Sequence, residues 1–184
     1  MTLEEALVEH CSPTLAGVKA GNMFRYVAHR SENIRTLIRD CEKEMSKDIK
    51  ISILKYCIKT SSYLLYVYRE KQLEEIFSDT DICNFMDKYS YCSCHTHRCY
   101  ISRLTERMLC EDDFPHEVGI FLGYPLCDVI GFIENRGKNY TCCGLWKSYC
   151  NPNEAELRFE RIRICSRIYK KMFRQGVRLK ELTV

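Results

Sequence analysis

The sequence predicts one α+β domain over residues 1–184, in which helices cover a small sheet of about four strands and a long helix lies near the C-terminus. Helical and strand patterns follow one another without the regular alternation of βαβ proteins. A chain of 184 residues that is 46% hydrophobic is large enough to bury one core. No internal repeat of 20 to 50 residues and no linker divides it.

The first 30 residues predict a helix and a strand. Thr2 is a suitable N-cap for a short helix from Leu3 to Glu9, which Ser12-Pro13 should end. Ala16 to Val27 predicts extended chain, because its two glycines weaken a helix and its β-branched and aromatic residues favour a strand.

A helix and a hairpin should follow. Ser31 is expected to cap a helix whose apolar residues recur at helical spacing as far as Met45. The period then changes to two, and Ile49 to Ile53 and Tyr63 to Arg69 predict the strands of a hairpin. Leu54 to Ile58 also suits the end of a helix.

Short helices occupy the middle of the chain. Asp113 and Pro115 are start signals for one of them, and the Gly123-Tyr124-Pro125 corner ends it and begins the next. The predicted ranges are Lys71 to Ser78, Thr80 to Tyr89, Ser102 to Leu109, Val118 to Leu122 and the helix from that corner through Glu134.

A turn, a strand and the longest helix complete the chain. Residues 135–139 predict the turn, and Cys143 to Tyr149 predicts the strand. Pro152 opens a helix from Asn153 to about Gln175, and Gly176 follows its end.

Composition and charge favour a globular cytoplasmic protein. Met1 to His10 contains three acids and no lysine or arginine, unlike a signal peptide, and no apolar run is long enough to cross a bilayer. The net charge of +3 does not by itself indicate nucleic acid or an anionic membrane as a partner. Thirteen cysteines, an odd number in a chain of this size, are expected to be reduced.

One long segment carries a family resemblance. Phe114 to Ile133 (FPHEVGIFLGYPLCDVIGFI) and Asn135 to Tyr149 (NRGKNYTCCGLWKSY), with Cys11 to Lys19, Leu64 to Arg69 and the final helix, resemble the clostridial domain-of-unknown-function family 3793 of anaerobic Firmicutes. The resemblance implies a single-domain, cytoplasmic bacterial protein with no assigned activity; the segment Tyr91 to Tyr100 departs from it. It draws attention to Cys11, Thr14, Lys19, Arg69, His116, Glu117, Tyr124 and Lys147.

Five potential metal ligands lie within eight residues. They are Cys92, Cys94, His95, His97 and Cys99. Thiolates and imidazoles suit zinc or iron, and zinc would take four of them. A segment this short must fold tightly around an ion without a glycine, and the alternative is a polar loop rich in thiols.

A cysteine and a histidine suggest nucleophilic chemistry. Cys11 beside His116, or alternatively His10, would form a pair in which the imidazole lowers the thiol pKa and produces the reactive thiolate. The alternative is that Cys11 packs at the entrance to a strand and His116-Glu117 begins a helix.

Cations in predicted strands suggest an anion site. Lys19, Arg69 and Lys147 would bind a phosphate or carboxylate if they converged, with Thr14 and Tyr124 as further ligand-binding residues. The alternative is that they are solvated strand charges.

A basic stripe marks the last helix. Arg163, Arg167, Lys170, Lys171 and Arg174 recur on one face, where nucleic-acid phosphates could bind, although such a run is more often a solvated face.

The thiols and the strand cations together favour a binding or accessory module for a small anionic ligand or a metal, linked to iron or thiol redox metabolism. A cysteine-dependent enzyme is the alternative, and nucleic-acid binding is a weaker one.

Overall fold

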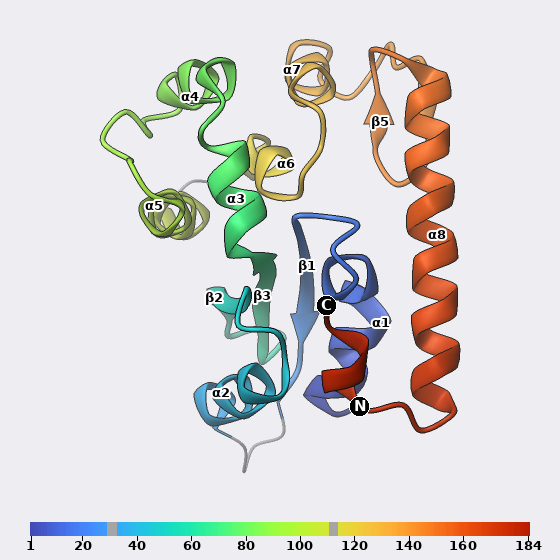
Figure 1. Cartoon of the computed structure of the whole chain (residues 1–184). Helices are drawn as coiled ribbons and strands as arrows, with labels where there is room; N and C mark the ends of the chain where they lie inside the picture. Colours follow the sequence, from blue (N-terminus) through green and yellow to red (C-terminus); the bar gives the residue numbers. More distant parts are fainter. Residues whose placement is uncertain (29–32, 111–113) are drawn as a thin grey trace. The chain divides into compact units, whose positions relative to one another are not determined.

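Helices and a small antiparallel sheet make up the chain, which confirms the predicted α+β class. The computed structural model describes residues 1–28, 33–110 and 114–184 (Figure 1). It divides into two units, residues 1–73 with 165–184 and residues 74–164, and each is described by itself. The single-domain expectation stays a prediction.

The first unit is built on three strands in the order β1-β3-β2. They are β1 (Gly21–Tyr26), β2 (Ile49–Cys57) and β3 (Ser62–Arg69). Both pairings are antiparallel, so the predicted hairpin of β2 and β3 is confirmed. The register shifts between Ile53 and Lys55, which makes the buried Leu54 the extra residue of a bulge. The alternative of a helix end at Leu54 to Ile58 is wrong, because β2 continues as far as Cys57.

Alternate strand residues form the core of this unit. Phe24 lies opposite Leu65, and Ile51 lies opposite Val67, so these four side chains share one face of the sheet. Three helical elements complete the same core: α1 (Leu3–Leu15), α2 (Ile34–Glu44) and the 3₁₀ helix η1 (Leu179–Leu182). In Figure 1, α1 lies beside β1.

Helix α1 is longer than the sequence predicted. It continues through Pro13 to Leu15, although proline lacks the N–H that would reach the carbonyl four residues earlier. The Ser12 hydroxyl donates to the Val8 carbonyl just before the proline, and Leu7, Cys11 and Leu15 are fully buried. Burial of this apolar face outweighs one missing hydrogen bond.

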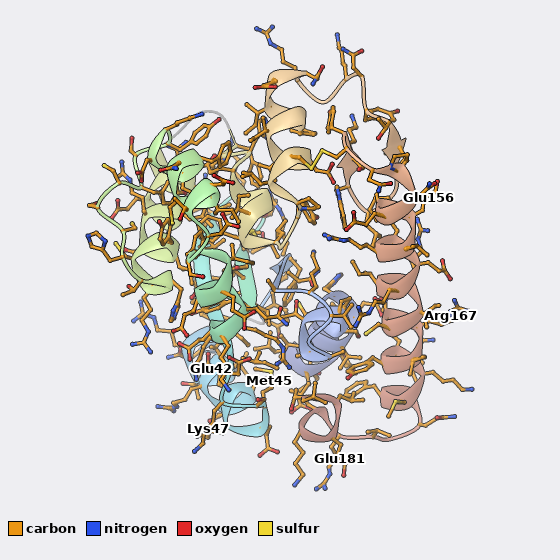
Figure 2. The ribbon with its side chains drawn as sticks, turned by 45° about the horizontal axis from the view of Figure 1, so that its top comes forward. Glu42, Met45, Lys47, Glu156, Arg167 and Glu181 are labelled. Carbon is orange, nitrogen blue, oxygen red and sulfur yellow. A yellow bond between two sulfur atoms is a disulfide. The ribbon has the colours of Figure 1, made fainter. Side chains whose placement is uncertain are left out.

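The strand and helix that follow also differ from the prediction at their edges. The expected extended run from Ala16 is a turn as far as Ala20, with Gly17 at φ +71°, and β1 begins at Gly21. Ser31 lies outside the described residues, and the described N-cap of α2 is Asn33, which accepts from the Arg35 N–H. At the other end of α2, Glu42 accepts the Ile51 N–H at 2.8 Å (Figure 2).

Arg69 joins the ends of this unit. Its guanidinium is 8% exposed and donates from Nε to the Thr14 carbonyl at 2.8 Å and from one terminal nitrogen to the carbonyls of Leu15 (3.0 Å) and Val184. The other terminal nitrogen donates to Asp48 at 3.2 Å. One buried cation therefore satisfies the carbonyls at the end of α1 and holds the C-terminus against them.

The second unit is mainly helical. Its elements are α4 (Thr80–Asp87), α5 (His97–Cys110), α6 (Val118–Phe121), α7 (Leu126–Glu134), β4 (Cys142–Cys143) and β5 (Lys147–Ser148). Two further helices, α3 (Glu70–Ile76) and α8 (Pro152–Arg174), contain residues of both units. The break before α4 is confirmed, with Asp79 as N-cap.

Of two helix starts predicted in this region, one differs from the structure and the other cannot be compared with it. Helix α5 begins five residues before the predicted Ser102, because Thr96 accepts the Cys99 N–H with its hydroxyl and the Tyr100 N–H with its carbonyl. The start signal at Asp113 lies outside the described residues. The corner between α6 and α7 and the long helix α8 are confirmed. Among the described helices, none is both long and apolar enough to span a membrane.

The aromatic core of the second unit contains one buried ion pair. Phe77 and Tyr100 stack with ring centroids 3.9 Å apart. Beside them, the side chain of Glu117 is 1% exposed. Its carboxylate accepts hydrogen bonds from Arg107 Nε at 2.6 Å and from the Tyr91 hydroxyl at 3.2 Å. Glu117, to which the family resemblance draws attention, is therefore part of the core.

We predict that Arg69→Met lowers the free energy of unfolding by about 3–5 kcal/mol, because it leaves Asp48 and three carbonyls without their buried donor. Urea denaturation followed by circular dichroism measures the change. Arg178→Met is the matched control, since that side chain is 66% exposed and pairs with Glu181 at the surface. Equal midpoints for the two variants would contradict the role given to Arg69.

Candidate functional site

The site begins with a short hairpin that the sequence presented as one strand. Cys143 to Tyr149 was predicted to be extended throughout, but β4 and β5 pair antiparallel, with Cys142 opposite Ser148 and Cys143 opposite Lys147. The chain reverses at Gly144, whose N–H donates to the Trp146 carbonyl at 3.0 Å. A Cβ at Gly144 would overlap the ring of Phe159, so only glycine allows this approach to α8.

Asp128 connects the hairpin to α7. Its carboxylate is 3% exposed, and one oxygen accepts the Ser148 hydroxyl at 3.0 Å and the N–H groups of Tyr149 (2.7 Å) and Cys150 (3.3 Å). The other oxygen accepts Trp146 Nε1 at 2.7 Å. Four donors compensate the buried charge, and the same bonds fix the indole and the end of the hairpin on the first turn of α7.

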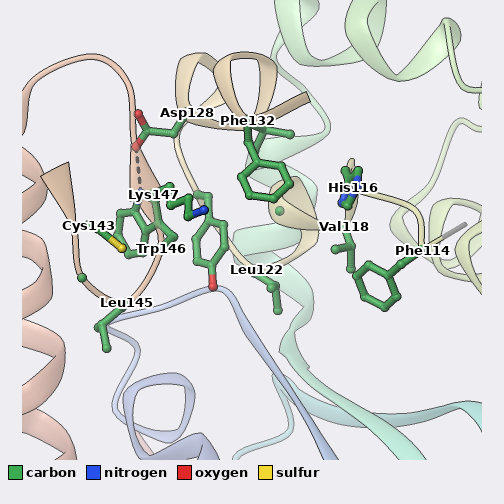
Figure 3. A pocket seen from close by; sticks show the side chains of 14 residues that line it. Phe114, His116, Val118, Leu122, Asp128, Phe132, Cys143, Leu145, Trp146 and Lys147 are labelled. Carbon is green, nitrogen blue, oxygen red and sulfur yellow. Dashed lines mark hydrogen bonds between the residues drawn. The ribbon is translucent and has the colours of Figure 1, made fainter. Parts of the chain in front are cut away.

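A pocket of about 340 Å³ opens between α6, α7 and the hairpin (Figure 3). Its lining is mostly aromatic and aliphatic, with few polar groups. The lining residues are Phe114, His116, Val118, Gly119, Leu122, Tyr124, Asp128, Val129, Phe132, Cys143, Gly144, Leu145, Trp146 and Lys147. Tyr124 and Trp146 stack with centroids 4.6 Å apart, and Phe159 packs edge-on against the indole at 4.5 Å.

Lys147 brings a positive charge to this pocket. Its ammonium donates to the Gly137 carbonyl at 2.6 Å and lies 5.1 Å from the centre of the Tyr140 ring and 6.0 Å from that of Phe132. Within the described part of the chain, no carboxylate pairs with it. Figure 3 shows the amine pointing toward Phe132.

Tyr124 and His116 also line the pocket. Burial raises the pKa of Tyr124, so its phenol stays neutral and can donate a hydrogen bond. His116 is exposed and packs edge-on against Phe132 at 5.0 Å. His116, predicted as a base, and Tyr124 and Lys147, predicted as anion ligands, therefore line one pocket.

Two cysteines beside the pocket are joined. Cys127 and Cys150 form a disulfide with their Cα atoms 6.4 Å apart, so the expectation of reduced thiols is wrong for this pair. With Asp128 they are the group of three potential metal ligands found among the described residues. Their sulfurs are bonded to each other and the Asp128 oxygens accept four donors, so this arrangement favours a disulfide over a metal centre.

The predicted metal ligands from Cys92 to Cys99 are spread apart. Cys94 Sγ and Cys99 Sγ lie 2.9 Å from each other, but His97 Nδ1 turns to Glu74 at 3.2 Å, and Cys92 and His95 are exposed. No three of these five residues bring ligand atoms together. Part of the segment is the first turn of α5, which directs successive side chains around the helix.

The environment of Cys11 does not produce a reactive thiolate. The side chain has no exposed surface, and burial raises its pKa well above the usual range. A neutral, inaccessible thiol suits the packing alternative. Cys11 belongs to the first unit and His116 to the second.

The other predicted anion ligands are held within the first unit. Arg69 donates to protein acceptors, as described above, and the Thr14 hydroxyl donates to Asn22 Oδ1 at 2.8 Å. Lys19 is half-buried in a turn; burial lowers its pKa to about 8, against the opposing effect of Cys11. Lys147, in contrast, lines the pocket described above.

The basic stripe of α8 includes at least one paired residue. Lys170 Nζ bonds Glu9 Oε1 at 2.6 Å and lowers the pKa of that carboxyl. Nucleic-acid binding by this helix stays a prediction.

Sequence reasoning missed two residues on which the pocket depends. Asp128 lies in the first turn of a helix, where an acid is ordinarily explained by the helix dipole. Trp146 was read as a strand residue, and its place in a turn follows from Gly144. The available signal was the only tryptophan of the chain, which is followed by Lys147 and lies two residues after Gly144.

Fold and pocket define a small α+β protein with an aromatic pocket that carries one cation. The chain belongs to the family described as Protein of unknown function (DUF3793), whose model matches residues 7–183. No curated protein and no solved structure gives a significant match. The family resemblance of the sequence is therefore confirmed, and its clostridial origin stays a prediction.

We predict that Asp128→Asn lowers the free energy of unfolding by about 2–4 kcal/mol. Both carboxylate oxygens of Asp128 accept N–H groups, and in asparagine one of these oxygens is replaced by an NH₂ group, which is itself a donor. Trp146 emission should also move to longer wavelength as the indole loses its partner. Chemical denaturation and fluorescence measure both effects. Asp81→Asn, an exposed acid in the first turn of α4, should change neither.

A second prediction concerns pH and Cys11. Because the folded pKa is raised, this thiol stabilises the fold below the pKa of the unfolded chain, near 9, and the stability is lost as pH rises above it. Above pH 9, the free energy of unfolding of the unmodified protein should fall with pH more steeply than that of Cys11→Ala. The difference between the two slopes should be up to about 1.4 kcal/mol per pH unit. Denaturation in reductant at several pH values measures the slope, with exposed Cys92→Ala as control. Rapid, selective alkylation of Cys11 at pH 7 would contradict the account.

Proposed function

We propose that this protein binds a small planar molecule that is mostly apolar and carries one anionic group, in the pocket bordered by Trp146, Phe132 and Lys147. The observation that carries the proposal is a lysine without a described acidic partner beside a pocket with an aromatic lining. A binding module of this kind agrees with the favoured hypothesis from the sequence.

The size and lining of the pocket support a ligand rather than a gap in packing. A volume of about 340 Å³ lies at the small end of the range for ligand pockets, about 300–1,000 Å³. Aromatic rings favour a flat apolar ligand, because offset stacking adds to the free energy of burial. The Asp128 bond to Trp146 orients one of these rings before a ligand arrives, which reduces the cost of ordering on binding.

Charge supports an anionic group on the ligand. The Lys147 ammonium has three N–H donors, of which one bonds the Gly137 carbonyl. A carboxylate, sulfonate or phosphate beside it would gain a charge-assisted hydrogen bond.

The described site favours binding over cysteine-dependent catalysis. Cys11 is fully buried, and Cys127 and Cys150 are joined to each other. Cys143 lines the pocket as an exposed free thiol, and the residue opposite it in the hairpin is Lys147 rather than a histidine or an acid that could act as its base.

We expect 2-naphthoate to bind at least 10 times more tightly than the neutral 2-naphthalenemethanol, since one charge-assisted hydrogen bond is worth about 1.5–3 kcal/mol. Isothermal titration calorimetry on the full chain measures both affinities. Lys147→Met should remove the preference for the anion. Asp128 and Trp146 are left unchanged in this experiment so that the pocket keeps its walls.

Lys138→Met is the matched control, because Lys138 is an exposed lysine of the neighbouring turn and does not line the pocket. It should preserve the preference for 2-naphthoate. Equal affinities for the acid and the alcohol in the unmodified protein, or a preference that survives Lys147→Met, would contradict the proposal.

A further inference from the structure

The disulfide lies at the surface beside the buried Asp128 corner. Cys127 is in the first turn of α7, and Cys150 follows β5 just before α8. Both residues are exposed, and Figure 2 shows the bond in yellow. Reductants and small disulfides in solution can therefore reach its sulfurs, unlike the buried thiol of Cys11.

The bond encloses the same residues that Asp128 orients. Cys127 precedes Asp128, and the N–H groups of Tyr149 and Cys150 donate to the Asp128 carboxylate. The disulfide thus closes a loop of chain, with a sequence separation of 23, on the hydrogen bonds that hold the hairpin to α7. When it opens, the hydrogen bonds to Asp128 still hold this corner, and the position of the Trp146 indole depends on those same bonds.

A metal site is the competing interpretation of these cysteines. In the reduced protein two thiolates and the Asp128 carboxylate would offer three ligand atoms to a divalent ion. Three N–H groups and one hydroxyl already donate to that carboxylate, so a metal would have to displace them. The geometry favours thiol and disulfide exchange.

We propose that Cys127 and Cys150 form a reversible dithiol and disulfide couple that exchanges with low-molecular-weight thiols and thereby tightens or loosens the Asp128 and Trp146 corner. This couple does not depend on ligand binding, because its readouts are the state of two thiols and the emission of one indole. It adds a redox-sensitive modification site to a protein whose proposed function is binding.

The exchange balances with a small disulfide, RSSR, as oxidant. One protein thiolate attacks a sulfur of RSSR, which forms a mixed disulfide and releases RS⁻. The second protein thiolate attacks the protein sulfur of that mixed disulfide, which forms the Cys127 to Cys150 bond and releases the second RS⁻. The two protons of the protein thiols complete two RSH, so the pair is oxidised by two electrons and RSSR is reduced by two.

The test equilibrates the full chain in buffers of reduced and oxidised glutathione, blocks thiols with N-ethylmaleimide and measures the Cys127 and Cys150 peptides by mass spectrometry. We expect both thiols to disappear together over one midpoint. Trp146 emission should shift to longer wavelength over the same midpoint as the pair becomes reduced. The single variants Cys127→Ser and Cys150→Ser should each accumulate a glutathione mixed disulfide on the remaining cysteine.

The double variant Cys127→Ser/Cys150→Ser should lose the redox response of Trp146 and emit like the reduced protein. Cys92→Ser, which removes an exposed thiol of the same unit, should keep it. Free thiols at both positions in oxidising buffer, or oxidation of the pair with no response of Trp146, would overturn the proposal. Stoichiometric zinc held by the reduced pair and blocking its oxidation would also overturn it and establish a metal site.

Discussion

The Asp128 carboxylate is the group on which the candidate site depends. A buried anion is stable only when donors replace its water, and here a hydroxyl, two backbone N–H groups at 2.7 and 3.3 Å and an indole N–H do so. These donors belong to residues 146–150, so the requirement to satisfy one charge folds that segment onto α7. The orientation of Trp146, the wall of the pocket and the approach of Cys150 to Cys127 follow from it.

Arg69 is the corresponding buried charge of the first unit, and its charge is positive. Its guanidinium takes up carbonyls at the end of α1 and at the C-terminus, groups that a helix or a chain end leaves unsatisfied. In both units, a buried charge that bonds backbone groups as well as side chains joins segments far apart in sequence. Such residues organise the fold, and this separates Arg69 from Lys147, whose charge faces a pocket.

Much of the fold could be predicted because it depends on local patterns. The change from helical to alternating spacing located the β2 and β3 hairpin, and Pro125 and Pro152 located the starts of α7 and α8. The failures have long-range causes. Pro13 is tolerated because α1 is buried, and residues 143–149 reverse because Gly144 lies against Phe159. Asp128 and Trp146 could not be paired from the sequence, since nothing local shows which buried acid receives an indole N–H 18 residues later.

The most direct test of the Asp128 corner is the indole N–H resonance of Trp146 in a proton–nitrogen correlation spectrum, which contains one such signal because the chain has one tryptophan. A bond to a buried carboxylate predicts a signal shifted downfield from that of a free indole, slow to exchange with water, and moved again by 2-naphthoate. A signal at the position of a free indole that exchanges rapidly and ignores the ligand would contradict the account.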